Sequence, residues 1–123
     1  MSYLLVFLGS GLGGMLRHGV NLLTPRFGLA LPYGTLFVNV VGSLLAGLVV
    51  GHLATRAAAA EAWRLFLMTG ILGGFTTFSA FSLDAVLLFE RGDPGSAALY
   101  VGGSLVGSIG AAVFGLWLAR AVA

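Results

Sequence analysis

One apolar segment of the chain, residues 65–89, carries at its centre the run Gly73-Gly74-Phe75-Thr76-Thr77-Phe78-Ser79-Ala80-Phe81-Ser82. Adjacent glycines, β-branched threonines and serines each weaken a helix a little, and here they weaken it at one place. A helix that is broken inside a membrane exposes amide and carbonyl groups, which protein, water or an ion must then satisfy. The alternative is an unbroken helix whose Ser and Thr hydroxyls donate to i−4 carbonyls, and composition alone favours it slightly.

Three further apolar segments accompany this one, at residues 3–23, 34–54 and 97–119. Of the 123 residues, 59% are hydrophobic and only 8% are charged, whereas a soluble domain carries about 25% charged residues. Each segment is long enough to cross a hydrocarbon core of about 30 Å. The sequence therefore predicts an all-α membrane protein, with one domain over residues 1–123, four transmembrane helices, and loops at 24–32, 56–64 and 90–95.

Several classes of function do not fit these residue types. The chain has no cysteine, which excludes disulfides and thiolate metal sites. Its six basic residues are scattered arginines, so no nucleic-acid surface is expected. It has no carboxylate pair, Ser-His-Asp set or metal-spaced cluster, so we do not expect an enzyme. No charged residue precedes Arg17, and the first segment is therefore expected to be a retained helix rather than a signal peptide.

Glycines recur at helical spacing inside the apolar segments. Gly47 and Gly51 form one i, i+4 pair, and a longer stripe consists of Gly103, Gly107, Ala111 and Gly115. Small residues in such stripes let helix backbones approach closely in lipid. We expect these glycines to mark helix–helix contacts, within one chain or between subunits.

The polar and aromatic residues inside the segments are the candidates for function. Phe78 and Phe81 share a helix face, and their positive ring edges could contact an anion, although an aromatic residue in a core or facing lipid is the more usual case. Asn39 offers an amide donor. Ser104 and Ser108, one turn apart, either line a pore or pack against another helix.

Three stretches together resemble the Fluc family of fluoride channels, also called CrcB proteins. They are Gly13-Gly14-Met15-Leu16-Arg17-His18, Phe37-Val38-Asn39-Val40-Val41-Gly42-Ser43 and the long run from Gly70 to Ser82. The resemblance covers essentially the whole chain. Two departures from the family pattern are Ala80 in place of a threonine and His18 in place of a tyrosine.

The resemblance implies an antiparallel, dual-topology homodimer in the inner (plasma) membrane, with two pores that let fluoride leave the cytoplasm passively. It implies a third helix broken at mid-membrane and a structural sodium ion at the dimer interface, held by the backbone carbonyls of Gly73 and Thr76. Arg17 would lie in a vestibule. The anion pore would contain Asn39, Thr77, Phe78, Ser79, Phe81, Ser104 and Ser108.

The main alternative is a small multidrug or metabolite antiporter, which is also a dimer of four-helix subunits. A proton-coupled exporter needs a carboxylate embedded in the membrane. The first 60 residues contain no acid, and Asp84 is the only acidic residue well inside a segment, toward one end. A third class, a structural subunit without transport, leaves the run in residues 73–82 unexplained.

The distribution of arginines predicts insertion in both orientations, because loop arginines set the topology of a membrane protein. The side with both termini and the second loop holds Arg56, Arg64 and Arg120. The other side holds Arg26 and Arg91, with Arg17 near the end of its segment. This bias is at most one residue. A single cysteine introduced beside Asp93 should therefore react with a membrane-impermeant reagent from both sides in comparable amounts, and labelling from one side only would exclude dual topology.

Overall fold

The computed structural model describes residues 1–24, 31–54 and 59–122 of the chain. In this part of the chain every regular element is helical. The elements are α1 (Ser2–Leu23), α2 (Tyr33–Leu53), α3 (Ala59–Arg64), the wider π-helical stretch η1 (Leu65–Leu72), α4 (Gly73–Phe75), α5 (Phe78–Glu90) and α6 (Pro94–Ala121). The expected loop residues Pro25, Arg26 and Arg56 lie outside the described residues.

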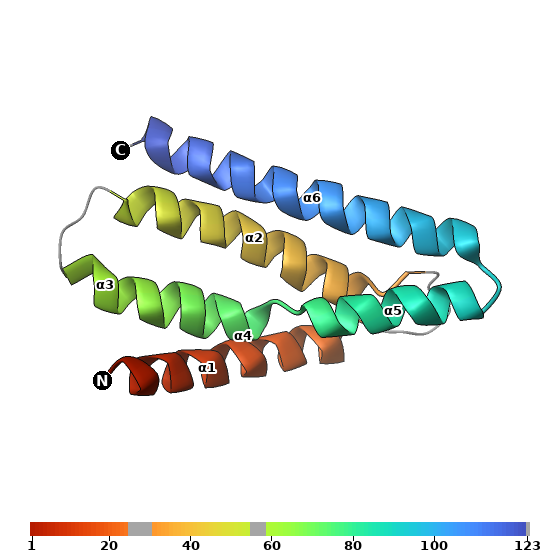
Figure 1. The fold of residues 1–123 in the computed structure, drawn as a ribbon, viewed down its shortest axis with the longest axis horizontal. Helices are drawn as coiled ribbons and strands as arrows, with labels where there is room; N and C mark the ends of the chain where they lie inside the picture. The colour runs from red at the N-terminus through yellow and green to blue at the C-terminus, as the bar shows by residue number, and fades with distance from the viewer. Residues whose placement is uncertain (25–30, 55–58, 123) are drawn as a thin grey trace.

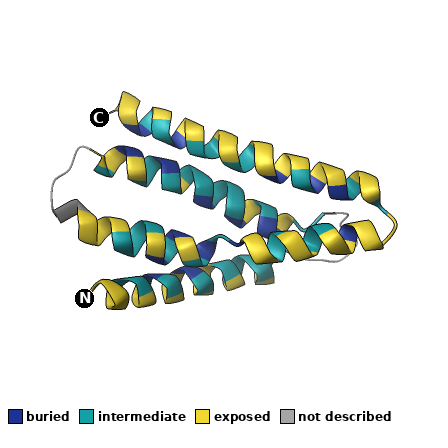
Figure 2. Ribbon diagram, in the orientation of Figure 1, coloured by how far each residue is buried: buried dark blue, intermediate teal, exposed yellow. Residues whose placement is uncertain are grey.

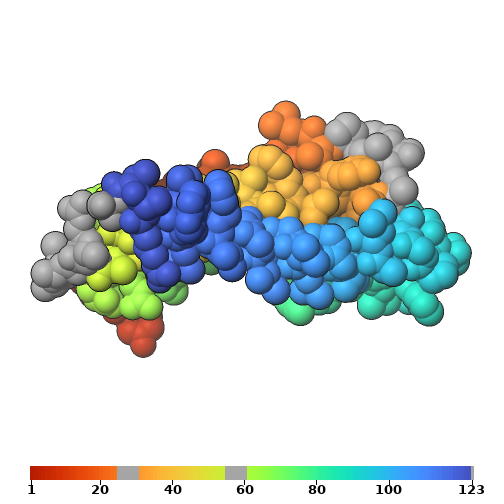
Figure 3. Space-filling model, turned by 90° about the horizontal axis from the view of Figure 1, so that it is seen from above, coloured from red at the N-terminus to blue at the C-terminus, as the bar shows by residue number. Residues whose placement is uncertain are grey.

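The elements form four rods that lie lengthwise beside one another (Figure 1). The first rod is α1, the second is α2, the third is the series from α3 to α5, and the fourth is α6. The first and third rods run in one direction, and α2 and α6 run in the other. Viewed from above, α6 extends along most of the length of the molecule (Figure 3).

The third rod is broken, as the family resemblance implies. Thr76 and Thr77 both have extended backbone, with φ/ψ of −84°/160° and −152°/124°. These residues lie near the middle of the apolar stretch Glu61–Glu90. The unbroken helix that composition alone favours is therefore wrong, because hydrogen bonds from α2 hold Thr77 extended.

Two other helix limits differ from the sequence prediction. Residues 59–64 are expected to be loop but form α3, where Glu61 in the first turn and Arg64 in the last turn lie 4.0 Å apart and favour a helix. The last helix starts at Pro94 rather than at residue 97. Asp93 caps it by accepting hydrogen bonds from the Ser96 amide at 3.1 Å and the Ser96 hydroxyl at 2.6 Å. The Ser96 hydroxyl and then its amide hold the pKa of Asp93 below its ordinary value.

Three helical stretches in the described residues are long and apolar enough to cross a membrane. They are Tyr33–Leu53, Glu61–Glu90 and Pro94–Ala121. The prediction of a membrane span is thus confirmed for three of the four segments. α1 has 22 residues but carries Arg17, His18 and Asn21 in its second half, and a span there stays a prediction.

The outer faces of the rods are largely exposed (Figure 2), and many of the exposed side chains are large and apolar. Exposed side chains include Phe7, Leu99, Val106 and Ile109, with exposed fractions from 63% to 75%. A soluble protein of this size would not leave such a continuous apolar surface facing water. Lipid is the environment that suits these faces.

Glycines set the two closest helix contacts. On α2, a Cβ at Gly47 would lie 2.9 Å from the Leu116 amide of α6, and on α1, a Cβ at Gly9 would lie 2.8 Å from the Gly70 Cα of η1. Gly51 and Gly115 also face the contact between α2 and α6, so the predicted packing role is confirmed for them. Gly103 instead has open space beside it within the single chain.

Candidate functional site

The site is built around the break between α4 and α5. At the end of α4, the Thr76 amide and the Thr76 hydroxyl both donate to the Leu72 carbonyl, each at 3.0 Å. At the start of α5, the Thr77 hydroxyl accepts a hydrogen bond from the Ala80 amide at 3.2 Å and thereby caps the helix. Thr76 and Thr77 weaken the helix locally. Their hydroxyls also form hydrogen bonds at the end of α4 and at the start of α5.

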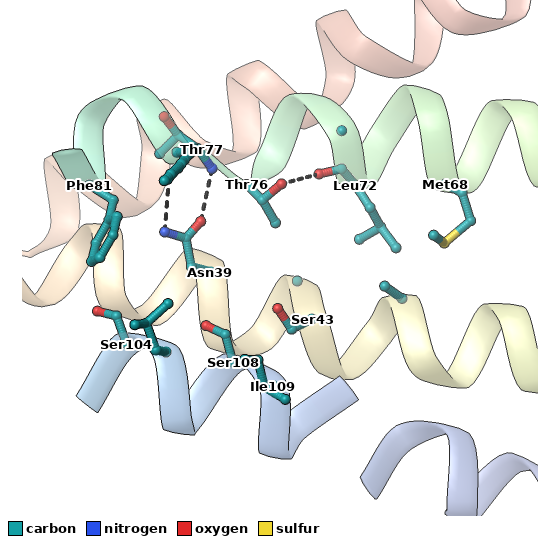
Figure 4. A pocket seen from close by; sticks show the side chains of 15 residues that line it. Asn39, Ser43, Met68, Leu72, Thr76, Thr77, Phe81, Ser104, Ser108 and Ile109 are labelled. Carbon is teal, nitrogen blue, oxygen red and sulfur yellow. Dashed lines mark hydrogen bonds between the residues drawn. The ribbon is translucent and has the colours of Figure 1, made fainter. Parts of the chain in front are cut away.

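The Asn39 side chain holds the break from the side of α2. Its Oδ1 accepts from the Thr77 amide at 2.8 Å, and its Nδ2 donates to the Thr77 carbonyl at 3.0 Å (Figure 4). A side-chain amide satisfies both backbone groups of an extended residue in this way, as a neighbouring β-strand would. This pair of hydrogen bonds removes the cost of leaving the Thr77 backbone unpaired in an apolar environment.

Backbone carbonyls at the end of α4 lose their helical donors as a consequence. In a continuous helix the Thr77 amide would donate to the Gly73 carbonyl, and the Ala80 amide would donate to the Thr76 carbonyl. The first amide instead donates to Asn39 and the second to the Thr77 hydroxyl. The carbonyls of Gly73 and Thr76 are thus among the groups that lose their helical donors at the break. Carbonyl oxygens of this kind can hold a cation.

An open pocket of about 380 Å³ lies beside the break, between the third rod, α2 and α6. Its polar contributions come from Asn39, Ser43, Thr76, Thr77, Ser104 and Ser108. Apolar side chains such as Met68, Leu72 and Ile109 line its other parts (Figure 4). The described residues that line this pocket carry no charge, so an ion in it would meet only dipoles.

Phe78 and Phe81 also line this pocket. Their ring centroids lie 5.6 Å apart and their planes differ by 21°. Phe81 also packs on the Tyr100 ring at 5.3 Å, whereas Phe78 is 67% exposed. Phe81 is therefore fixed by the fold of one chain, and Phe78 has a free ring surface for a further contact.

The two serines of α6 project from that helix toward α2 (Figure 4). Ser104 is only 5% exposed, and in the described part of the chain its hydroxyl is buried without a hydrogen-bond partner. A buried hydroxyl left unpaired is costly. The Ser104 hydroxyl belongs to the pocket lining, where a small acceptor could take its hydrogen bond.

Comparison with known proteins places this chain clearly. Residues 4–116 match the family model described as CrcB-like protein, Camphor Resistance (CrcB). The chain belongs to the CrcB family. It is 56% identical to the fluoride-specific ion channel FluC 2 of Nitrobacter hamburgensis, with 98% of each chain covered. It is 58% identical to the fluoride-specific ion channel FluC of Rhodopseudomonas palustris strain BisB5, with 99% of each covered. The family resemblance inferred from the motifs is thereby confirmed.

In this CrcB protein, not all of the predicted site residues line the pocket. Asn39, Gly73, Thr76, Thr77, Phe78, Phe81, Ser104 and Ser108 line the pocket. Ser79 is exposed, and its hydroxyl lies 3.4 Å from the Thr77 hydroxyl, outside the pocket lining. Arg17 is half-buried on α1, also outside that lining. The roles of these residues in conduction stay predictions.

Sequence reasoning missed one polar contact next to the CrcB pocket. Tyr100 is 1% exposed, and its hydroxyl donates to the Asp84 carboxylate at 3.3 Å. This contact engages the one acidic side chain inside an apolar segment and packs Tyr100 behind Phe81. A signal was present in the sequence, because Tyr100, Ser104 and Ser108 are spaced four residues apart and share one face of α6.

The Asn39 contacts predict a measurable loss of stability. Replacing Asn39 with Leu keeps the volume but leaves the Thr77 amide and carbonyl unpaired, at about 1–3 kcal/mol for each group. We expect a clearly lower thermal unfolding midpoint for the purified protein in detergent. Ser82→Ala is the control, because it removes an exposed hydroxyl that donates only to the Phe78 carbonyl. An Asn39→Leu protein as stable as the wild type would show that the break does not depend on Asn39.

Proposed function

We propose that the protein is a fluoride-selective channel that lets fluoride leave the cytoplasm passively through the inner membrane and so reduces fluoride toxicity. The observation that carries the proposal is the uncharged pocket of hydrogen-bond donors beside a helix break. It occurs in a chain more than 50% identical, over nearly its full length, to fluoride-specific ion channels. A channel needs no catalytic groups, in keeping with the absence of an enzyme motif.

The chemistry of the pocket suits a small, strongly hydrated anion. Such an ion enters a pore only when hydrogen-bond donors replace its water, and it leaves only when they hold it weakly enough. An amide, hydroxyls and aromatic ring edges meet both conditions, because each carries only a partial positive charge. A fixed arginine in the same position would bind the anion more tightly and slow its release.

The proposal includes an antiparallel homodimer. In a single chain the pocket is open, Phe78 is 67% exposed, and Gly103 and Gly110 have open space beside them. A second copy would close the pocket and bury these small residues. Opposite orientation of the two copies is favoured by the balanced arginines, and it supplies the inverted symmetry that larger transporters encode as internal repeats.

The proposal also includes a sodium ion at the dimer interface, held by the carbonyls of Gly73 and Thr76. Gly73 is exposed on the surface of the single chain, where a partner's carbonyls could join it. In the described residues no group of three His, Cys, Asp or Glu side chains is placed to hold a metal. Backbone carbonyl oxygens are thus the candidate ligands, and oxygen ligands suit a hard cation such as sodium. A bound cation would lower the cost of an anion nearby.

The antiporter alternative gains no support from the geometry. Its required carboxylate would have to be Asp84, which accepts the Tyr100 hydroxyl and does not line the pocket. The relatives named above are channels by name, in agreement with this placement.

Reconstituted protein should release fluoride but not chloride from liposomes. In the double variant Phe78→Ile, Phe81→Ile, bulk is kept and the ring quadrupole is lost, so we expect fluoride flux to fall at least about tenfold, the effect of about 1.4 kcal/mol. Gel filtration should show an unchanged oligomer. Phe89→Ile, at a ring that is 66% exposed and outside the pocket, is the matched control. Wild-type flux in the double variant would contradict the role of the rings.

Sodium should stabilise the purified protein against heat when compared with an organic cation at equal ionic strength. A ligand that binds only the folded state at 100 times its Kd adds about 2.7 kcal/mol. Thr76→Ser keeps the backbone carbonyl and should keep the sodium response, whereas Gly73→Leu should abolish it. Equal unfolding midpoints with and without sodium would exclude the site.

A further inference from the structure

Ser43 is a polar residue of the pocket to which no role has been given. It lies on α2 one helical turn after Asn39, is half-buried, and lines the same pocket. Other hydroxyls near the break are engaged with backbone, since Thr76 donates to the Leu72 carbonyl and Ser82 to the Phe78 carbonyl. Over the described ranges, the hydroxyls of Ser43 and Ser108 have no hydrogen-bond partner.

The packing of α2 on α6 places Ser43 relative to the serines of α6. These helices run in the same direction (Figure 1). Gly107 lies beside Val40, with its Cβ position 3.3 Å from the Val40 Cγ2, and Gly115 lies beside Gly47, with its Cβ position 3.2 Å from the Gly47 Cα. Along the shared direction of the two helices, each α6 residue therefore lies at the same height as the α2 residue that is 67 or 68 positions earlier in the sequence.

This register interleaves the polar side chains of the two helices. Asn39 falls at a level between Ser104 and Ser108, and Ser43 falls beyond Ser108. Figure 4 shows this order along the pocket, which is Ser104, Asn39, Ser108, Ser43. At about 1.5 Å per residue, successive groups are separated along the axis by about 2–4 Å. A small anion could therefore pass from one donor to the next without losing all its hydrogen bonds.

We propose that the Ser43 hydroxyl is a further anion-binding group of the pore, one step beyond Ser108. This inference rests on the proposed fluoride channel. Beyond Ser43 the pocket wall on α2 continues with Ala46, and on α6 beyond Ser108 it continues with Ile109, neither of which offers a side-chain donor. Ser43 is thus the last side-chain donor of these two helices on the way toward the apolar end of the pocket near Met68.

The test is fluoride efflux from liposomes that each hold about one channel, because this assay separates two quantities. The fraction of fluoride released reports how much protein is folded and assembled, and the rate reports conduction per channel. We expect Ser43→Ala to lower the rate about tenfold with the released fraction unchanged, because one hydrogen bond to a charged group is lost. Ser43→Thr retains the hydroxyl and should retain most of the rate. Ser82→Ala, outside the pocket, is the control and should conduct like the wild type.

Four outcomes would overturn the inference. Wild-type rate in Ser43→Ala would show that the hydroxyl does not contact the anion, while the proposed function would stand. An equal loss in Ser43→Thr and Ser43→Ala, or a loss only in the released fraction, would assign Ser43 to packing. If the wild type releases no fluoride, the proposed function fails and this inference fails with it.

Discussion

The pair of hydrogen bonds between Asn39 and the Thr77 backbone is the interaction on which the site depends. An extended residue inside an apolar helix would otherwise leave an amide and a carbonyl unpaired, which is too costly to persist. Asn39 satisfies both groups at 2.8 and 3.0 Å. The break then persists, α5 starts with its own cap, and the carbonyls of Gly73 and Thr76 become available. One neutral side chain thereby holds the break that borders the pocket and the proposed cation site.

Close helix packing brings Asn39 within reach of the break. Gly42 lies about one helical turn after Asn39 on α2. It faces the Thr76 side chain, which leaves no room for a Cβ at this position. Gly74, just before the break, is equally close to the Ser10 backbone of α1. The third rod is therefore held from two sides at the residues next to the break. Glycine is required at these points because the neighbouring backbones and side chains occupy the space of a methyl group.

In the proposed channel, the pocket would stabilise an anion without charged side chains. An anion in a low-dielectric environment needs compensation, but a full opposite charge would trap it. A series of partial charges would avoid tight binding, because each donor would contribute a modest amount and the next donor is only a few ångströms away. Phe81 would belong to the same series, and its contact with Tyr100, which in turn donates to Asp84, fixes the direction of its ring.

The sequence by itself determined the membrane environment, the approximate positions of the apolar segments and the family, because hydrophobic length and a long motif are local properties of the chain. It also pointed to Asn39, the phenylalanines and the serines as candidates. Only the tertiary structure showed what breaks the third helix, since the local composition slightly favours a continuous helix and the deciding hydrogen bonds join residues 38 positions apart. The register of α2 against α6, and with it the position of Ser43, could likewise not be predicted from the sequence. It follows from glycine contacts between two helices, which no single segment of the sequence contains.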